Sequence, residues 1–227
     1  MMDFRAARRA MVDGQVRTND VTHLGIIAAM LDIPREAFVP EAQAAFAYLD
    51  RDVLIADATA TEPPRYLMKP VVLARLIQAA NPALADRILV IGAGTGYSAA
   101  VLSRLVGEGT GKITALEENE SLFQQARSAL SSLGSHNVNV IHGYLVDGAS
   151  DSGPYDVILI DGGVETVPDR LCAQLSPRGR LLAVEMTGPL GKAKLFQPVS
   201  GRFSGRELFD ASAPVLPGFS VAPAFVF

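Results

Sequence analysis

A run of closely spaced glycines, Gly92-Ala93-Gly94-Thr95-Gly96, follows the apolar segment 87–91 and opens an expected helix. Without a β-carbon, glycine lets the backbone turn sharply and approach a ligand closely. Glu117 lies about twenty residues further on, at the end of a second expected strand, where an acidic side chain can hold a ribose diol. These residue types and their spacing predict a nucleoside site. Two alternatives stay open: the turn holds no ligand, or Glu117 is a solvated carboxylate beside Glu118 and Glu120.

The spacing of the glycines favours one kind of nucleoside. The dinucleotide fingerprint is G-x-G-x-x-G, whose helix N-terminus faces a pyrophosphate. Here the spacing is G-x-G-x-G, followed by Tyr97, which suits a nucleoside without a diphosphate that carries an amino-acid group near the turn. S-adenosylmethionine fits this description. An oxidoreductase that uses NAD is the alternative that the tighter spacing disfavours.

A parallel sheet is needed to bring these residues to one edge. From Asp86 onward, short apolar runs alternate with helical patterns. Strands are expected at 87–91, 112–116, 137–141, 156–160 and 180–185, and helices at 97–106, 121–133 and 169–175. This alternation predicts an α/β fold, a Rossmann-like doubly wound and mostly parallel sheet. The pieces 194–199 and 206–211 are expected to form an antiparallel edge at the C-terminus.

The first eighty residues have helical spacing and lack strand alternation. Helices are expected around 11–16, between a cap at Asn19 or Asp20 and Pro34, at 41–46 and at 67–80, with a loop at 56–65. A single domain is predicted over 1–227. Its parts are an N-terminal helical lobe with a lid loop at 1–80, a cofactor-binding core at 81–185 and a C-terminal β edge at 186–227.

The composition excludes several classes of protein. With 227 residues, 49% hydrophobic and 19% charged, the chain can bury a core and is not intrinsically disordered. No apolar run reaches the roughly 20 residues of a membrane span, and the net charge of −4 disfavours nucleic acid. The single Cys172 fits a reducing compartment, and with three scattered histidines it offers no metal site. We expect a cytoplasmic protein; its oligomeric state stays open.

Several segments outside the glycine turn carry a family resemblance. The signature 33–40 (Ile-Pro-Arg-Glu-Ala-Phe-Val-Pro) and the segments 12–17, 47–50, 89–97 and 168–181 resemble those of protein-L-isoaspartate O-methyltransferases. The resemblance implies protein repair: a methyl group passes from S-adenosylmethionine to the carboxylate of an isoaspartyl residue in a damaged protein or peptide. That carboxylate, with a pKa of about 4, is already anionic, so the reaction needs no general base.

Four positions depart from the family pattern. The serine of the loop before helix 67–80 falls on Met68, and the acid two residues before the first glycine is Val90. The acid expected near adenine is absent from Gly143-Tyr144-Leu145, and Asp161 stands where the family has an uncharged residue. These departures favour, as an alternative function, a diverged member that methylates another acceptor or binds cofactor without isoaspartyl activity.

Candidate site residues follow from the pattern and the resemblance. Cofactor contacts are predicted for Gly92, Ala93, Gly94, Thr95, Gly96, Glu117, Gly143 and Tyr144, the last by stacking on the purine. Catalytic candidates are Thr59 and Thr61, whose loop could fold back in place of the missing serine, and Asp161, which could orient the methionyl amine or act as a base. The alternatives are an ordinary surface loop for the threonines, a half-buried aromatic without a ligand for Tyr144 and a turn-capping role for Asp161.

Overall fold

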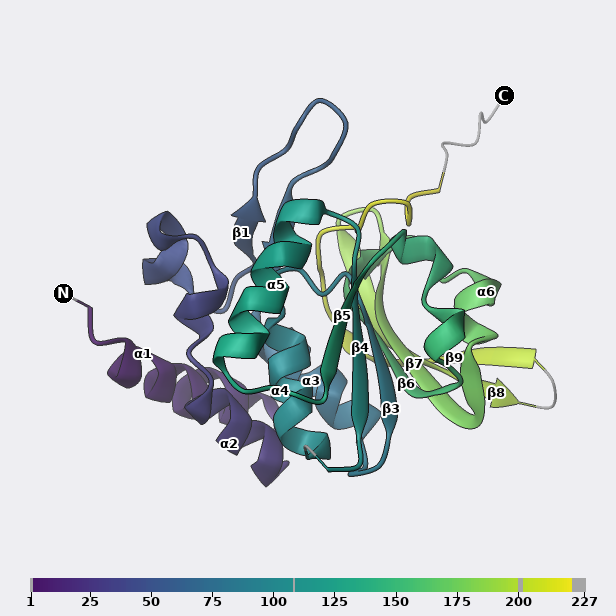
Figure 1. Cartoon of the computed structure of the whole chain (residues 1–227), viewed down its shortest axis with the longest axis horizontal. Helices are drawn as coiled ribbons and strands as arrows, with labels where there is room; N and C mark the ends of the chain where they lie inside the picture. The colour runs from purple at the N-terminus through teal and green to yellow at the C-terminus, as the bar shows by residue number, and fades with distance from the viewer. Residues whose placement is uncertain (1, 108, 200–201, 222–227) are drawn as a thin grey trace.

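A seven-stranded sheet forms the centre of the protein, in the order β5-β4-β3-β6-β7-β8-β9 (Figure 1). The computed structural model describes residues 2–107, 109–199 and 202–221. The strands are β3 (Arg87–Ile91), β4 (Lys112–Glu117), β5 (Val138–His142), β6 (Tyr155–Val164), β7 (Leu175–Thr187), β8 (Leu190–Val199) and β9 (Arg202–Asp210). The first five are parallel, and β8 and β9 add an antiparallel edge. The predicted fold class is confirmed.

Helices cover both faces of the sheet, with most of them on one side (Figure 1). The α-helices are α1 (Phe4–Met11), α2 (Leu24–Asp32), α3 (Pro70–Ala80), α4 (Tyr97–Val106), α5 (Glu120–Ser132) and α6 (Asp169–Cys172). Short turns are π-helical at Val12–Val16 and 3₁₀-helical at Arg17–Asn19, Arg35–Phe38, Glu41–Phe46, Leu145–Asp147 and Ser150–Ser152. Among the described residues, no helix has the length and apolarity to cross a membrane.

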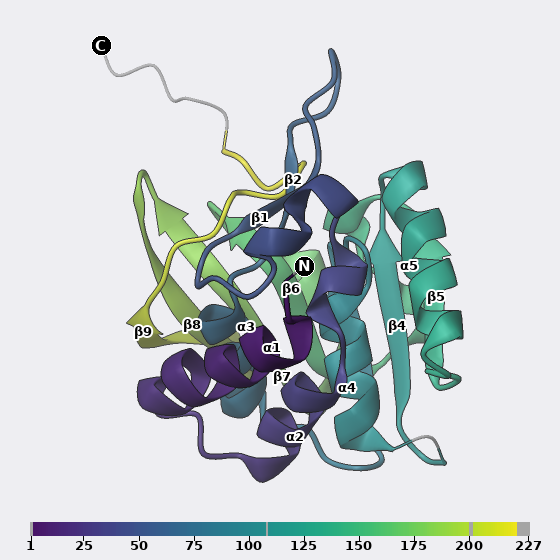
Figure 2. The ribbon, with the colours of Figure 1, turned by 90° about the vertical axis from the view of Figure 1, so that its left-hand side faces the viewer.

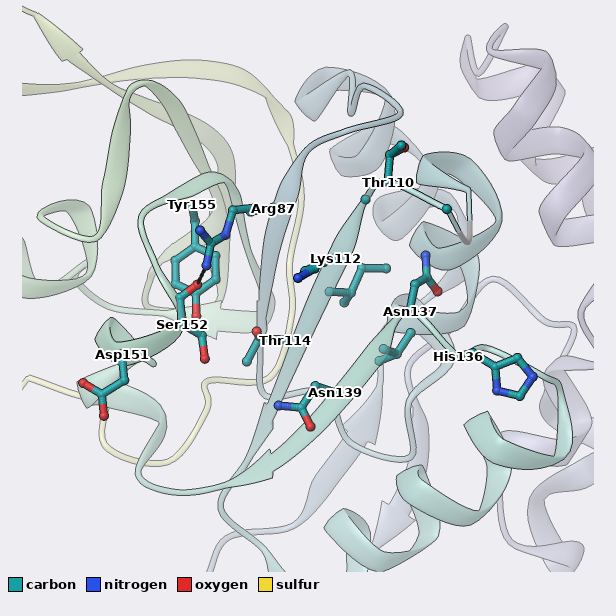
Figure 3. Close-up of a pocket in the computed structure, with 14 residues that line it drawn as sticks. Arg87, Thr110, Lys112, Thr114, His136, Asn137, Asn139, Asp151, Ser152 and Tyr155 are labelled. Carbon is teal, nitrogen blue, oxygen red and sulfur yellow. Dashed lines mark hydrogen bonds between the residues drawn. The ribbon is translucent and has the colours of Figure 1, made fainter.

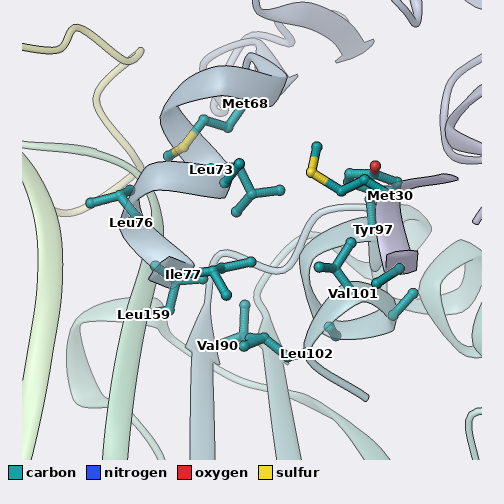
Figure 4. Packing of buried hydrophobic residues seen from close by; sticks show 14 of the residues in the cluster. Met30, Met68, Leu73, Leu76, Ile77, Val90, Tyr97, Val101, Leu102 and Leu159 are labelled. Atoms are coloured by element: carbon teal, nitrogen blue, oxygen red, sulfur yellow. The ribbon is translucent and has the colours of Figure 1, made fainter. Parts of the chain in front are cut away.

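The central strand β3 explains why the sequence shows a continuous apolar run there. Ile88 and Val90 pack on the side of α3 and α4, whereas Leu89 and Ile91 pack on the other face with Leu171. Figure 4 shows part of the first cluster, in which Leu73 and Ile77 of α3 and Val101 of α4 lie around Val90 of β3. A strand buried on both faces needs apolar residues at every position, without alternation. This burial fixes the end of β3, and with it the start of the glycine turn.

The prediction of a strand-free N-terminal part is wrong. A hairpin of β1 (Val53–Ala56) and β2 (Arg65–Leu67) pairs there in antiparallel register. Strands of four and three residues are too short to show a period, and their pairing depends on tertiary contacts. The predicted loop 56–65 is the connection between them, and α3 begins only at Pro70, a residue suited to the first helical turn.

Several other boundaries differ from the predicted ones. His23, rather than Asn19 or Asp20, caps α2: its Nδ1 accepts a hydrogen bond from the Ile26 amide at 3.3 Å. The helix expected at 169–175 ends at Cys172 because Leu175 already begins β7. The strands β6 and β7 also run longer than predicted, since they pair along an irregular ladder that extends to Val164. By contrast, α4 has its predicted bounds.

Candidate cofactor site

The register of the central strands places three of the candidate site residues side by side at one edge of the sheet. Ile91 of β3 pairs with Leu116 of β4 and with Ile160 of β6. The next residue on each strand is therefore Gly92, Glu117 or Asp161. This is the carboxyl edge of the sheet at the point where the strand order reverses, which is the usual ligand site of such folds.

The glycine turn adopts backbone conformations that favour glycine. Gly92, Gly94 and Gly96 have φ values of 75°, 56° and 98°, in the region that residues with a β-carbon rarely adopt. Gly96 also precedes α4 and packs against α5, where a β-carbon would lie 3.0 Å from a Leu130 methyl carbon. The hydroxyl of Thr95 donates to the Phe38 carbonyl at 2.6 Å, so this side chain joins the turn to the N-terminal lobe.

Glu117 is fully buried, and its carboxylate is saturated with hydrogen bonds. The backbone amides of Gly94, Glu118 and Asn119 donate to it at 2.8, 3.0 and 2.9 Å. Arg65 adds a bidentate ion pair, with Nη1 to Oε1 at 2.6 Å and Nη2 to Oε2 at 2.9 Å. The alternative that Glu117 is a solvated loop carboxylate is wrong. Its position beside the glycine turn is the predicted one, but its partner is an arginine of this same chain.

Side chains of the chain itself fill the space in front of the glycine turn. A β-carbon on Gly92 would lie 2.7 Å from a Leu216 methyl carbon and 3.6 Å from Arg65 Nη2, and one on Gly94 would lie 2.8 Å from Ile55 Cδ1. The cavity left beside Arg65 and Leu216 measures about 10 Å³, whereas small-molecule sites have roughly 300–1,000 Å³. The turn and the acid are thus in place, but an adenosyl cofactor does not fit in this conformation.

An open depression of about 630 Å³ lies elsewhere, at the amino ends of the strands. Figure 3 shows its lining, which includes Arg87, Lys112, Asn139 and Tyr155. These residues lie on β3, β4, β5 and β6 at the end opposite to the glycine turn. It is therefore not the predicted cofactor site.

The comparisons with known proteins agree with the sequence signature. The sequence model of the protein-L-isoaspartate(D-aspartate) O-methyltransferase family (PCMT) matches residues 6–199. The chain belongs to this family. The protein-L-isoaspartate O-methyltransferase of Pelotomaculum thermopropionicum is 37% identical over 80% of this chain and 75% of its own length. That of Methylorubrum extorquens is 34% identical over 97% of this chain and 92% of its own.

Solved structures of the family share the fold. A protein-L-isoaspartate O-methyltransferase structure superposes with a TM-score of 0.80 at 28% identity, covering 93% of this chain and 66% of that one. A Plasmodium falciparum beta-aspartate methyltransferase (PCMT), solved in complex with S-adenosyl-L-homocysteine, superposes with a TM-score of 0.76 at 17% identity, over 95% of this chain and 99% of its own. The second likeness supports the fold.

The family signature at 33–40 is structural in this PCMT chain. Arg35 is buried, donates from Nε to the Ala47 carbonyl at 2.7 Å and from Nη2 to the Met68 carbonyl at 2.6 Å, and lies 4.7 Å from the centroid of the Tyr97 ring. The arginine thus joins the N-terminal lobe, the segment before α3 and the start of α4. The position that carries serine in the family pattern holds the buried Met68, whose carbonyl is engaged by this contact.

Of the other candidate residues, Gly143 lies close to Glu117, whereas Tyr144, Thr59 and Thr61 are exposed. Gly143 lies next to β4, with its amide donating to the Glu117 carbonyl at 3.2 Å. Tyr144 is 74% exposed rather than half-buried. Thr59 and Thr61 are exposed in the loop between β1 and β2, which extends from the body of the protein (Figure 2). The Thr59 hydroxyl accepts from the Thr61 amide within that loop. Cofactor and catalytic roles for these residues stay predictions.

Asp161 is enclosed within β6, three residues before its end, and does not cap a solvated turn. Only 5% of it is exposed, and its Oδ1 atom has no hydrogen-bond partner among the described residues. Burial raises the pKa of Asp161 to about 6, against the opposing effects of the Ser98 hydroxyl and of the Arg35 and Arg65 charges. A carboxyl group in this position changes its charge close to neutral pH.

Asp161→Asn is expected to stabilise the protein at neutral pH. The folded protein holds the Asp161 proton to a higher pH than the unfolded chain, whose aspartates have pKa values of about 3.9. Wild-type stability therefore falls as the pH rises from about 4 to about 6, by up to about 3 kcal/mol for a shift of about two pKa units.

Urea unfolding of the wild type and of Asp161→Asn at pH 4 and pH 7.5 checks this expectation. The variant should gain stability only at pH 7.5, and the exposed Asp151→Asn at neither. An equal difference at both pH values would show that the carboxylate ionises freely when folded.

Two residues that fill the site have no part in the sequence predictions. Arg65 ends the predicted loop, yet in Arg65-Tyr66-Leu67 the strand period places it on the same face as the buried Leu67. A buried arginine needs partners for its guanidinium, and a carboxylate is a common one, so this alternation was the available signal. Leu216 lies in a Pro- and Gly-rich tail without a period, and its place against the glycine turn depends on tertiary contacts alone.

Proposed function

We propose that this chain is an S-adenosylmethionine-dependent methyltransferase that esterifies the carboxylate of isoaspartyl residues in damaged proteins. Membership of the PCMT family supports the enzyme class and the cofactor. The observation that carries the proposal is the alignment of Gly92, Glu117 and Asp161 at the edge of the sheet where the strand order reverses. A cytoplasmic setting is part of the proposal, since an isoaspartyl repair enzyme needs access to intracellular proteins.

The reaction makes modest demands on the side chains. The acceptor carboxylate is already anionic at neutral pH, and the leaving sulfide needs no proton, so positioning supplies most of the acceleration. Bound S-adenosylmethionine would supply the electrophilic methyl group. A site without an acid–base pair is therefore compatible with this chemistry. In this chain, Met68 supplies no hydroxyl donor, and Asp161 adds a buried carboxyl group beside the site.

A methylation assay with labelled S-adenosylmethionine tests the proposal. Two peptides of the same sequence are compared, one with isoaspartate and one with aspartate at a single position. We expect label transfer to the isoaspartyl peptide only, as a base-labile methyl ester. Equal labelling of both peptides, or of neither, would contradict the isoaspartyl acceptor.

Of the four departures that favour the diverged-member function, the replacement of the family serine by the buried Met68 bears most directly on the site. If this alternative holds, calorimetry detects S-adenosyl-L-homocysteine binding while the isoaspartyl peptide is not labelled. Labelling of another class of acceptor in the same assay would then define its substrate.

A further inference from the structure

The ion pair of Arg65 and Glu117 stands where a cofactor's ribose would be held. Both side chains are buried, with exposures of 5% and 0%. The carboxylate already accepts hydrogen bonds from three backbone amides. The two hydrogen bonds from the Arg65 guanidinium therefore occupy the lone pairs that a ribose diol would need. Arg65 Nε has no hydrogen-bond partner among the described residues. The contact with Glu117 is thus the main polar contact that holds this side chain in the site.

Leu216 also covers the turn, from a segment that is hydrogen-bonded to β6. The Gly163 amide donates to the Pro214 carbonyl at 2.8 Å, the Leu216 amide donates to the Gly163 carbonyl at 2.9 Å, and the Glu165 amide donates to the Phe219 carbonyl at 3.0 Å. This pairing places the Leu216 side chain against two glycines. A β-carbon added to Gly92 would lie 2.7 Å from a carbon of Leu216, and one added to Gly162 would lie 2.5 Å from another.

The two elements that carry these side chains meet over the site. β2 and the segment 213–216 line the same small cavity, and in Figure 2 the C-terminal segment passes beside the β1–β2 hairpin. Both elements are short and lie outside the central strands. β2 has three residues, and the segment 213–219 pairs with β6 through Gly163 and Glu165. Opening of the site would displace these two short elements and leave the central strands and the glycine turn in place.

We propose that Arg65 and Leu216 close the cofactor site of this chain, and that the cofactor binds only after the Arg65–Glu117 pair has broken and Leu216 has withdrawn. This inference rests on the proposed function, because it concerns the same site. A ligand that binds only the open state has an apparent affinity reduced by the fraction of open molecules. Variants that weaken the closing contacts should bind the cofactor product more tightly than the wild type.

The experiment measures binding of S-adenosyl-L-homocysteine by calorimetry to the wild type, Arg65→Gln and Leu216→Ala. Both variants are expected to bind about tenfold more tightly or better, since each removes one contact of the closed state. Arg178→Gln, which changes an exposed arginine, is the matched control and should bind like the wild type. Because Arg65→Gln leaves Glu117 buried without its cation, Leu216→Ala serves as the second, independent variant, and thermal unfolding verifies that each protein is folded.

Hydrogen exchange of the wild type gives a second readout that needs no variant. With saturating S-adenosyl-L-homocysteine, the amides of 65–67 and 213–219 should lose protection, while those of β3 keep it. Tight binding by the wild type that neither variant improves, with unchanged exchange in both segments, would overturn the closed site and leave the proposed function standing. Absence of binding by all the folded proteins would overturn the proposed function and the closed site together.

Discussion

Glu117→Gln is expected to lower the free energy of unfolding by about 3–5 kcal/mol, because the change leaves Arg65 charged and buried without its counter-ion. The pair is bidentate and almost entirely enclosed. Glutamine has nearly the same shape and keeps one carbonyl oxygen for the backbone amides. The loss therefore reports on the charge rather than on packing. Urea denaturation at pH 7.5 measures it, with the slope checked to be equal for the two proteins.

A double-mutant cycle with Arg65→Gln separates the ion pair from the other roles of Glu117. Since replacing both ends of a buried pair removes the uncompensated charge, Arg65→Gln/Glu117→Gln should be more stable than Glu117→Gln alone. Additive effects of the two single changes would show that the two groups do not interact in the folded protein.

The same contact changes the interpretation of a simpler experiment on the cofactor. From the sequence, Glu117 is expected to accept hydrogen bonds from a ribose, so that Glu117→Ala would weaken cofactor affinity by roughly 1–3 kcal/mol. In the structure, the carboxylate also holds the amides of Gly94 and Asn119. Its removal would alter the turn itself. A loss of affinity in this variant would therefore not by itself identify a ribose contact.

The parts of the fold that the sequence predicted are those governed by strong local patterns. β3 is apolar at every buried position, α4 follows a glycine turn, and the strand–helix alternation that begins at Asp86 specifies a parallel sheet. The same patterns placed Gly92 and Glu117 at the carboxyl edge, since each directly follows or ends a recognisable strand. Their predicted proximity is seen in the structure, where the Gly94 amide donates to Glu117.

The parts that the sequence did not predict depend on contacts between distant segments. Arg65 meets Glu117 across 52 positions of the chain, and Leu216 reaches Gly92 from the C-terminal tail. Neither segment has a periodicity that specifies a partner. A short motif predicts the backbone of a site, because the residues that form this backbone are close together in the sequence. It does not predict which side chains from distant parts of the chain pack against that backbone.

The second large effect is expected at Arg35, the buried arginine of the family signature. Arg35→Ala should lower the free energy of unfolding by roughly 3–5 kcal/mol. It leaves the Ala47 and Met68 carbonyls without donors, at about 1–3 kcal/mol each, and removes the contact with the Tyr97 ring. Because these contacts join the N-terminal lobe to the sheet domain, we expect hydrogen exchange to increase first at 35–47.

Two variants make this test specific. Arg35→Lys keeps the positive charge but not the planar fork, which reaches the Ala47 and Met68 carbonyls from separate nitrogens. It should therefore recover only part of the loss. Arg5→Ala removes an exposed arginine of α1 and should change stability by less than about 0.5 kcal/mol. If Arg35→Ala and Arg5→Ala were equally mild, the lobe would be held to the core mainly by its apolar contacts, and the arginine of the signature would have another role.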